Sequence, residues 1–468
     1  MYKRYLLLSL FPVLVILLFA QTPSDQSSSS SFFGSAQANS TNMINQGRQT
    51  FRFDTFGDEA FWGGQLKLHQ TINHLTPTQA LQLGLKVDSD ALPPAVIQAI
   101  KSGKVNLNDP TVTLLLIKLN AVLGVKGFFN GNGTLSSVGL TCAVCHSTVD
   151  NSIAPSIGKR IDGIANHDLN VGAIVASAPN LQPVIDLLKI VHPNITADQV
   201  RAVLNSWGPG KFDAEIFLDG KAFNPRQVTN GMVTGMNVPG ATLIPNARGL
   251  AGHNLHTWTG GWGTVTYWNA FVAVDEMHGK GTFFDERFDN AAQFPIAAKA
   301  KLGHVSIDNP DDDRVTGKLA ALQFYQLALP ALKPRPGIDF DADAAERGDQ
   351  LFSGKANCNS CHREPLWTEP GWNQHTPSEM KIDAFEANRA PASINAQGAA
   401  VHGYRTMNLA QVFVRERGLF MFPQDKGRFY HDGRFQTLLD VVNSYNDRFN
   451  LGLSDPEKHD LVEYLKSL

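Results

Sequence analysis

Apolar residues recur at helical spacing over much of this chain, so the pattern predicts helices rather than long strands. Between residue 51 and about residue 132, Asp58-Glu59 opens one amphipathic segment and Asp109-Pro110 opens another that is rich in Leu and Val. The apolar positions of the first segment are Phe61, Trp62, Leu66, Leu68 and Ile72. These signals predict a helical extension at the start of the folded part of the chain.

Capping residues mark three later helices. The expected ranges are 196–207, with Thr196 as the N-cap, 341–352, and 454–468, which opens with Ser-Asp-Pro-Glu. The stretch 212–223 instead predicts a short hairpin around Leu218-Asp219-Gly220. Three prolines within 329–337 mark the best domain boundary.

The N-terminus has the pattern of an export segment. Lys3 and Arg4 precede an apolar run from residue 5 to residue 20, which predicts a signal peptide or an uncleaved anchor over 1–20. The Ser-, Gln- and Asn-rich stretch 21–48 is expected to be a disordered tether. We therefore expect a periplasmic or otherwise exported protein, tethered to the membrane if the segment is not cleaved.

Composition narrows the class of protein. The chain has 468 residues, of which 43% are hydrophobic and 18% charged, and this predicts a globular protein with a large core. A formal charge of −3 argues against a nucleic-acid partner. The 40 glycines and 25 prolines favour long loops between the helices.

The four cysteines of the chain form two copies of one motif, C-x-x-C-H. Its residues are Cys142, Cys145 and His146 in the first copy and Cys358, Cys361 and His362 in the second. In this signature two thiols form thioethers to a haem and the adjoining imidazole ligates the iron. A four-thiolate zinc site and a thioredoxin-like pair are the alternatives, but the former needs closer pairs and the latter needs no His. The sequence thus predicts two covalently bound haem c groups.

Residues around the second motif resemble a known family. The segments that carry the resemblance are 344–348 (AAERG), 351–352, 358–362, 403–406 (GYRT), 430–435 (YHDGRF) and the last helix. Together they resemble the C-terminal half of the bacterial dihaem cytochrome c peroxidase superfamily. That superfamily includes the enzyme that matures the tryptophan cofactor of methylamine dehydrogenase, and the dihaem rubber oxygenases are related to it. The resemblance covers about 338–468, and earlier only the first haem motif and the patch 245–261 look similar.

The resemblance implies a mainly α fold with two class I cytochrome c-like haem domains and long loops. The N-terminal haem domain with its helical extension would span 49–330, and the C-terminal cytochrome c domain would span 338–468. For the second haem, family peroxidases place a ligating Met fourteen residues after the His of the Y-H-D-G segment, whereas the maturing enzyme places a Tyr. That position here is Tyr445, with Met407 or Met421 as alternatives. The family histidine itself, His431, is expected near this haem without ligating iron.

The first haem lacks a counterpart of the family's distal His, because no His occurs between His192 and His253. This implies an iron that is open to H2O2 or O2. A thioether from Met232 or Met236 is the alternative, and it would make this haem a closed electron carrier.

Two further roles are implied by the resemblance. The tryptophan between the haems maps onto Trp258, with Trp262 and Trp268 as alternatives. The distal acid maps onto Glu286, and the neighbouring His278 and Glu276 are alternatives for its acid–base role. A Ca2+ between the haems is implied by the family only.

The predicted function is that of an exported dihaem oxidoreductase of the cytochrome c peroxidase type, with chemistry at His146 and electron supply at His362. Its electron donor would be a small redox protein or a quinol-linked donor, and a homodimer is possible. Oxidative modification of an organic or protein substrate and plain electron transfer remain alternative functions.

Overall fold

The computed structural model describes residues 26–225, 227–229, 232–234, 238–394 and 399–468. Residues 43–468 form one compact unit that is mainly helical, as the sequence predicts. The predicted export segment 1–20 lies outside the described residues, and so does Met236. In the described part of the chain, no helix combines the length and the apolar character needed to cross a membrane.

A long helix replaces most of the predicted disordered tether. This helix, α1, spans Gln26–Phe53, so the prediction of disorder over 21–48 is wrong for the described residues. Its C-terminal end is held by packing, because Phe51 is fully buried with its ring centroid 5.6 Å from that of Tyr325. A Cβ on Gly47 would lie 1.9 Å from the carbonyl oxygen of Ala321, so α1 packs closely against α13 (Leu319–Ala328). Polar composition alone does not show this contact.

The predicted extension consists of short helices and one hairpin. Its elements are a π-helix at Ala60–Gln65, α2 (Leu68–Ile72), α3 (Pro77–Gln82), β1 (Val87–Asp88), a 3-10 turn at Ser89–Ala91, α4 (Pro94–Lys101), α5 (Pro110–Lys118), β2 (Val125–Phe129) and β3 (Leu135–Leu140). Asp109 caps α5, as predicted, by accepting a hydrogen bond from the Thr111 amide. The β2–β3 hairpin pairs Val125 with Leu140 and leads directly into the first haem motif.

The middle of the chain places short elements around the first motif. They are α6 (Ala143–His146), β4 (Ser147–Val149), β5 (Ile157–Gly158), β6 (Arg160–Asp162), α7 (Val171–Ala176), α8 (Gln182–Leu188), α9 (Ala197–Ser206), β7 (Lys211–Phe212), α10 (Ile216–Asp219), β8 (Phe223–Asn224), β9 (Gln227–Thr229), β10 (Met232–Thr234), β11 (Val238–Pro239) and β12 (Thr242–Leu243). Thr196 caps α9 in a capping box with Gln199, which confirms the predicted N-cap.

The predicted hairpin at 212–223 is wrong. Residues 216–219 form α10, which ends at Gly220 with a positive φ of 75°. The flanking strands β7 and β8 pair with β12 and β11 instead of with each other. A positive-φ glycine ends a helix as readily as it forms a hairpin turn, so the local signal alone does not separate the two.

The rest of the middle region follows the aromatic segment. It contains α11 (Val265–Phe271), a π-helix at Val272–Glu276, β13 (Phe283–Phe284), a 3-10 turn at Glu286–Asp289, α12 (Pro295–Ala300), β14 (His304–Val305), 3-10 turns at Pro310–Asp312 and Thr316–Lys318, and α13. The proline-rich stretch 329–337 contains no helix or strand and connects α13 to the C-terminal helices.

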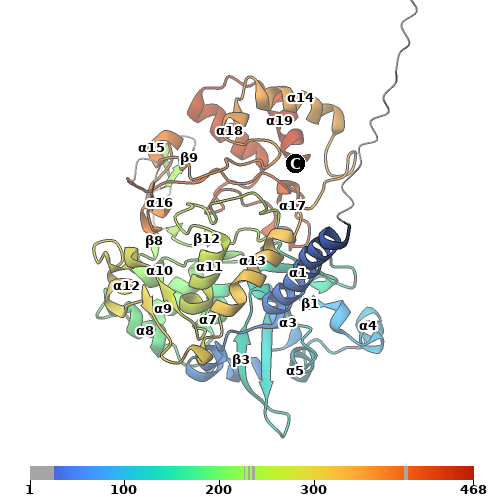
Figure 1. Cartoon of the computed structure of the whole chain (residues 1–468), viewed down its shortest axis with the longest axis vertical. Coiled ribbons are helices and arrows are strands. Elements are labelled where there is room, and N and C mark those ends of the chain that lie inside the picture. Colours follow the sequence, from blue (N-terminus) through green and yellow to red (C-terminus); the bar gives the residue numbers. More distant parts are fainter. Residues whose placement is uncertain (1–25, 226, 230–231, 235–237, 395–398) are drawn as a thin grey trace, which may run out of the picture. The chain divides into compact units, whose positions relative to one another are not determined.

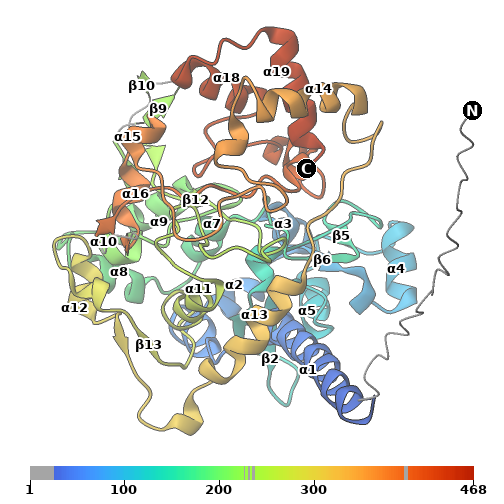
Figure 2. The same ribbon diagram turned by 45° about the horizontal axis from the view of Figure 1, so that its top comes forward.

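The C-terminal part has its own hydrophobic core. Its elements are α14 (Ala342–Ser353), a 3-10 turn at Cys358–Ser360, α15 (Pro377–Met380), α16 (Phe385–Arg389), β15 (Ser393–Ile394), β16 (Ala400–Val401), α17 (Val412–Arg417), a 3-10 turn at Pro423–Asp425, α18 (Leu438–Phe449) and α19 (Asp455–Lys466). Helices α14, α18 and α19 lie together in both views (Figures 1 and 2). Asp341 and Ser454 cap α14 and α19 as predicted.

The crossing of α14 and α19 depends on one glycine. A Cβ on Gly348 would lie 2.1 Å from the carbonyl oxygen of Asp460, so only glycine permits this approach. One turn further along α14, the ring of Phe352 lies 5.0 Å from that of Tyr464. This contact explains the Ala-Glu-Arg-Gly pattern physically, because a small residue is needed where the two helices touch.

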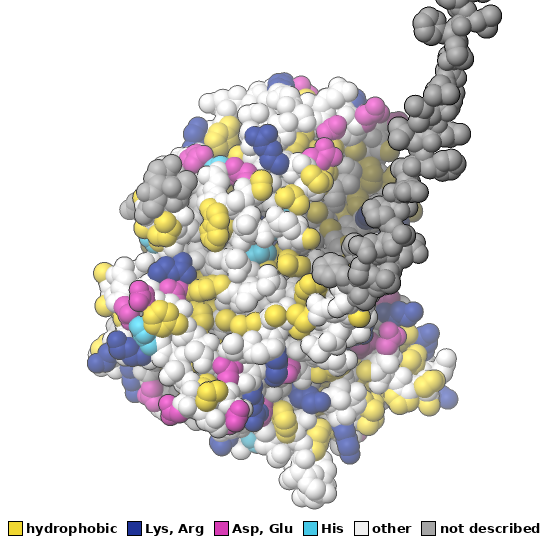
Figure 3. Space-filling model, in the orientation of Figure 1, with side chains coloured by type: hydrophobic (Ala, Val, Ile, Leu, Met, Phe, Trp, Pro, Cys, Tyr) yellow, Lys and Arg dark blue, Asp and Glu magenta, His cyan; other side chains and the backbone are white. Residues whose placement is uncertain are grey.

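Strands contribute little to the compact unit. All pairings in the described residues are two-stranded, and only β1 with β5 is parallel. On the face shown in Figure 3, Lys and Arg side chains are interspersed with Asp and Glu, so no field of one sign dominates it.

Candidate functional site

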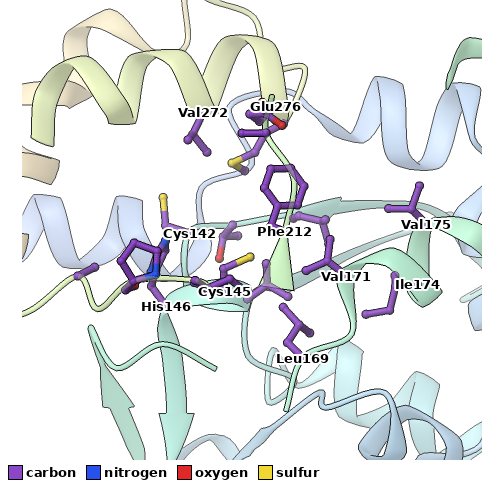
Figure 4. Close-up of a pocket in the computed structure, with 18 of the residues that line it drawn as sticks. Cys142, Cys145, His146, Leu169, Val171, Ile174, Val175, Phe212, Val272 and Glu276 are labelled. Carbon is purple, nitrogen blue, oxygen red and sulfur yellow. The ribbon is translucent and has the colours of Figure 1, made fainter. Parts of the chain in front are cut away.

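The first C-x-x-C-H motif lines a buried cavity of about 280 Å³ (Figure 4). Cys142 precedes the single turn α6, and this turn brings Cys145 and His146 to the same cavity. The Nδ1 atom of His146 lies 3.1 Å from the carbonyl oxygen of Pro245. Burial lowers the pKa of His146 to about 4, so the imidazole is neutral. When Nδ1–H donates to the carbonyl, Nε2 has a free lone pair for a metal, which is the usual arrangement of a ligating histidine.

The second motif repeats this arrangement in a separate cavity of about 540 Å³. Cys358, Cys361 and His362 line it, and His362 Nδ1 lies 3.0 Å from the carbonyl oxygen of Trp367. Burial lowers the pKa of His362 as well, so this imidazole is also held in its neutral form. Both histidines are therefore oriented by a backbone carbonyl and present Nε2 to a cavity.

The two rival interpretations of the cysteines do not fit this geometry. All four cysteines are free thiols, and the two pairs line different cavities, so they do not form a four-thiolate zinc site. Burial raises the pKa of Cys142, Cys145 and Cys358 to about 12, which keeps these sulfurs protonated and disfavours thiolate redox chemistry.

Unpaired buried cations support haem as the group that fills these cavities. Arg405 and Arg415 line the second cavity, and burial lowers their pKa values to about 10 and about 9. No carboxylate forms an ion pair with either side chain in the described part of the chain. A buried unpaired charge is costly, and a haem carries two propionate carboxylates that would compensate such charges. The residues present therefore fit a haem in each cavity.

Trp258 and Arg405 form part of the wall of both cavities. The Trp258 indole nitrogen donates a hydrogen bond to the Leu243 carbonyl at 2.7 Å, which fixes the ring. Trp262 and Trp268, the alternatives from the sequence, line only the first cavity. Of the three tryptophans, Trp258 is therefore the one that lies on the wall shared by the two cavities.

Three glutamates face the first cavity, which is otherwise mainly apolar. They are Glu215, Glu276 and Glu386. Glu276 is the last residue of the π-helix that follows α11, and Figure 4 shows it across the cavity from His146. Burial raises the pKa of Glu276 well above its usual value, and the carboxylates of Asp275 and Glu215 add to the effect. Glu276 therefore keeps its proton to a higher pH than an exposed glutamate does, and it lies where it can donate that proton into the cavity.

This position corrects two predicted site residues. Glu286 is exposed and lines neither cavity. His278 also lies outside both cavities, and its ring stacks on Phe61 with 3.6 Å between centroids. Of these three residues, only Glu276, which the sequence offered as an alternative, lines the first cavity. The extra residue of the π-helix turns this carboxylate toward the cavity, and spacing along the sequence does not predict such a bulge.

A buried ion-pair network lies behind the three glutamates. Arg389 is fully buried and pairs with Asp213 at 2.8 Å and with Asp219 at 2.9 Å. Burial raises the pKa of Asp213 to about 6 despite the neighbouring guanidinium. The network joins α16 to the segment around α10, and the C-terminal part thereby helps to build the first cavity.

Replacement of Arg389 by Met is expected to lower the free energy of unfolding by about 3–5 kcal/mol, because two buried carboxylates lose their partner. Chemical denaturation followed by circular dichroism measures this loss. The control is Arg347→Met, since the Arg347–Asp460 pair is largely exposed and is expected to contribute less than about 1 kcal/mol. Equal effects of the two substitutions would contradict the assigned role of Arg389.

Tyr445 lines the second cavity, as its predicted role requires. Met407 lines the same cavity, whereas the buried Met421 does not. His431 is buried on the cavity wall, and its ring stacks on Tyr404 with 4.9 Å between centroids. Tyr445 and Met407 thus remain the two candidate ligands opposite His362.

The sequence missed two residues that the cavities contain. Met277 follows Glu276 and lines the first cavity, where its thioether is a possible iron ligand. The alternatives named from the sequence cannot be compared with it, because the side chains of Met232 and Met236 lie outside the described residues.

His375 lines the second cavity. Its ring nitrogens lie 2.6 Å from Glu369 and 2.8 Å from Glu379, and with a further hydrogen bond to Cys361 they raise its pKa to about 10. Cys361, Glu369 and His375 are close enough to hold a metal ion, but a thioether link to haem would use this sulfur. A single histidine without an adjacent motif gives no sequence signal of this kind.

Comparison with known proteins gives a distant similarity. No family model matches the chain. Over 193 residues the chain is 27% identical to a protein named cytochrome-c peroxidase IdrP1 from Denitromonas iodatirespirans, which covers 34% of this chain and 51% of the relative. The chain therefore spans about half the length of the curated relative it matches. A hydrazine synthase structure from Kuenenia stuttgartiensis is 20% identical with a TM-score of 0.25, covering 49% of this chain and 72% of that one. That structural likeness is too low to carry an argument.

Proposed function

We propose that this protein is an exported dihaem c-type cytochrome of the peroxidase type. One haem would be attached through Cys142 and Cys145 with His146 as its iron ligand, and would react with H2O2 or O2. The other, attached through Cys358 and Cys361 and ligated by His362, would supply electrons. The observation that carries the proposal is the pair of separate cavities, each with a complete C-x-x-C-H motif, that share Trp258 and Arg405 as a common wall.

The haem iron, when bound, supplies the electrons and the open coordination position that cleavage of an O–O bond requires. The residues of the chain supply the proton, exclude water and hold the ligand in place. Glu276 holds a proton at its carboxyl group and donates it to the leaving oxygen, the apolar wall excludes bulk water, and His146 is held in one orientation by Pro245. Trp258 fills the space between the two sites.

Mixing the purified ferric protein with H2O2 tests the proposal. We expect a rapid change of the Soret band, followed by its return when a reduced electron donor is added. An unchanged Soret band would overturn the proposed function. A reduced c-type cytochrome and a quinol are the donors to compare, because the proposed partners are a small redox protein and a quinol-linked donor.

Plain electron transfer is the second candidate function, and Met277 is the observation that favours it. If the Met277 thioether caps the first iron, both irons are six-coordinate and low-spin, and neither CO nor cyanide binds. Met277→Ala would then open the site and restore ligand binding. Binding of cyanide to the unaltered protein excludes this function.

Oxidation of an organic or protein substrate is the third candidate. The first cavity is lined in part by the N-terminal extension, through Trp62, Ile72 and Val125 among others, and this gives it an apolar wall. Sustained turnover with a reduced cytochrome as the only donor would favour the peroxidase over this function. A Ca2+ between the haems also belongs to the proposal, because the family resemblance implies it, and a homodimer is part of the proposal without that support.

Replacement of Tyr445 by Met is expected to raise the reduction potential of the second haem by about 100 mV or more, because a thioether ligand favours ferrous iron over a phenolic one. A spectroelectrochemical titration measures the change. Met407→Leu is the matched control, since it removes the competing ligand and should leave the potential near that of the unaltered protein. If Met407→Leu shifts the reduction potential and Tyr445→Met leaves it unchanged, Met407 is the ligand.

A further inference from the structure

Trp262 is a fully buried indole on the wall of the first cavity. Only 1% of its surface is exposed. Its ring centroid lies 4.4 Å from that of Phe271 and 5.1 Å from that of Trp268, which is partly exposed and lines the same cavity. The indole is therefore near the proposed haem, shielded from water, and in contact with an aromatic side chain that reaches toward the surface.

The Trp262 N–H group has an acid as its partner. Nε1 donates a hydrogen bond to the Glu215 carboxylate at 3.1 Å. Glu215 immediately precedes α10, is 3% exposed, and lines the first cavity. Burial raises its pKa to about 7, so the carboxyl group exchanges a proton readily near neutral pH. A hydrogen-bonded carboxylate that can take up a proton makes loss of an electron from the indole easier.

Trp258 differs from Trp262 in this respect. Its N–H donates to the Leu243 carbonyl, and a backbone carbonyl cannot accept a proton at any accessible pH. Trp258 is thus suited to fill the space between the two sites, whereas Trp262 has a proton acceptor beside the cavity.

We propose that Trp262 is a redox-active residue that gives up one electron to the first haem site and one proton to Glu215. This inference rests on the proposed reaction with H2O2. Reduction of H2O2 to two molecules of water takes two electrons and two protons, and the two protons would come from the Glu276 carboxyl group and from water. One electron comes from the haem group and the other from Trp262, whose N–H bond breaks. The proton moves to the Glu215 carboxylate, and a neutral indole radical remains until an external donor returns the electron and Glu215 returns the proton.

The position of Trp268 extends the role of this radical. Ring-to-ring contact at 5.1 Å allows the missing electron to be replaced through Trp268. A donor that is too large to enter the cavity would therefore still be oxidised. We therefore expect the electron donor to be a one-electron donor that reacts at the protein surface, such as a phenol or a redox protein.

Electron paramagnetic resonance of the haem-loaded protein, frozen shortly after mixing with H2O2, tests the inference. We expect an organic radical whose signal narrows when the protein carries ring-deuterated tryptophan. Trp262→Phe should lower the radical yield by about tenfold or more, and Glu215→Gln should do the same, because glutamine accepts the hydrogen bond but not the proton. The Glu215→Gln variant keeps the buried indole, so it tests the inference even if the Trp262→Phe variant does not fold.

Glu416→Gln is the matched control. The Glu416 carboxylate accepts a hydrogen bond from the Leu438 amide at 2.9 Å and lines neither cavity, so its replacement should leave the radical yield unchanged. A tryptophan radical that persists at full yield in both the Trp262 and the Glu215 variants overturns the inference. If the haem reacts with H2O2 and no tryptophan signal forms, only this inference fails. A haem that does not react at all overturns the proposed function as well.

Discussion

Replacement of His146 by glycine is expected to abolish the fast reaction with H2O2, with a loss of about a thousandfold or more, while the second haem remains spectrally intact. The physical reason is that His146 lines the first cavity, the Pro245 carbonyl orients it through Nδ1, and its Nε2 is left for the proposed iron. Without it, the proposed iron loses the ligand that fixes its position and its electron density. Stopped-flow absorbance of the Soret band measures the rate.

The matched substitution at the second motif should behave differently. His362→Gly is expected to keep the first, single reaction with H2O2 and to lose repeated turnover, because only the electron supply is affected. Added imidazole should occupy the space left by the missing side chain and partly restore the reaction that each variant has lost. If His362→Gly loses the first reaction and His146→Gly keeps it, the two haems have the opposite roles.

Features that depend on a few neighbouring residues could be predicted from the sequence. The caps at Thr196, Asp341 and Ser454 are local hydrogen bonds between residues three apart, and each one is present. The C-x-x-C-H motif is likewise local, since one turn of backbone places both thiols and the imidazole at the same cavity.

Features that depend on distant contacts could not be predicted. The end of α1 is held by Tyr325, which lies 274 residues after Phe51 in the sequence. Arg389 lies in no chemical motif and pairs with Asp213 and Asp219, which lie 176 and 170 residues earlier in the sequence. Arg405 lies in the segment 403–406, but this segment does not show that the side chain lines both cavities. Their roles follow from burial and partners, which a single sequence does not contain.

The position of the distal acid differs between the sequence-based prediction and the structure. Family spacing points to Glu286, whereas the structure places Glu276 on the cavity, ten residues earlier. Glu276 is the last residue of a π-helix, whose extra residue rotates the side chains that follow. Spacing along the sequence does not show this local winding, although one extra residue does not by itself account for a difference of ten.

Replacement of Glu276 by Gln is therefore expected to slow the reaction with H2O2 by about 10²–10⁴-fold, since glutamine fills the same space but cannot donate a proton. Burial and neighbouring carboxylates raise the pKa of Glu276, so the acid form persists to a higher pH than in an exposed glutamate and is lost as the pH rises through that raised pKa. The rate in the unaltered protein should fall toward alkaline pH, and the rate in the variant should lose this dependence. Stopped-flow rates across the pH range measure both effects.

Glu286→Gln is the matched control for this experiment, because Glu286 is exposed and lies on neither cavity. It should react at the rate of the unaltered protein and keep the same pH profile. A large loss in the Glu286 variant, together with little change in the Glu276 variant, would return the acid–base role to the residue that the family spacing indicates. The two carboxylates lie in the same short segment and differ in burial. Comparison of the two variants therefore distinguishes a role of Glu276 in the cavity from a general effect of removing one charge.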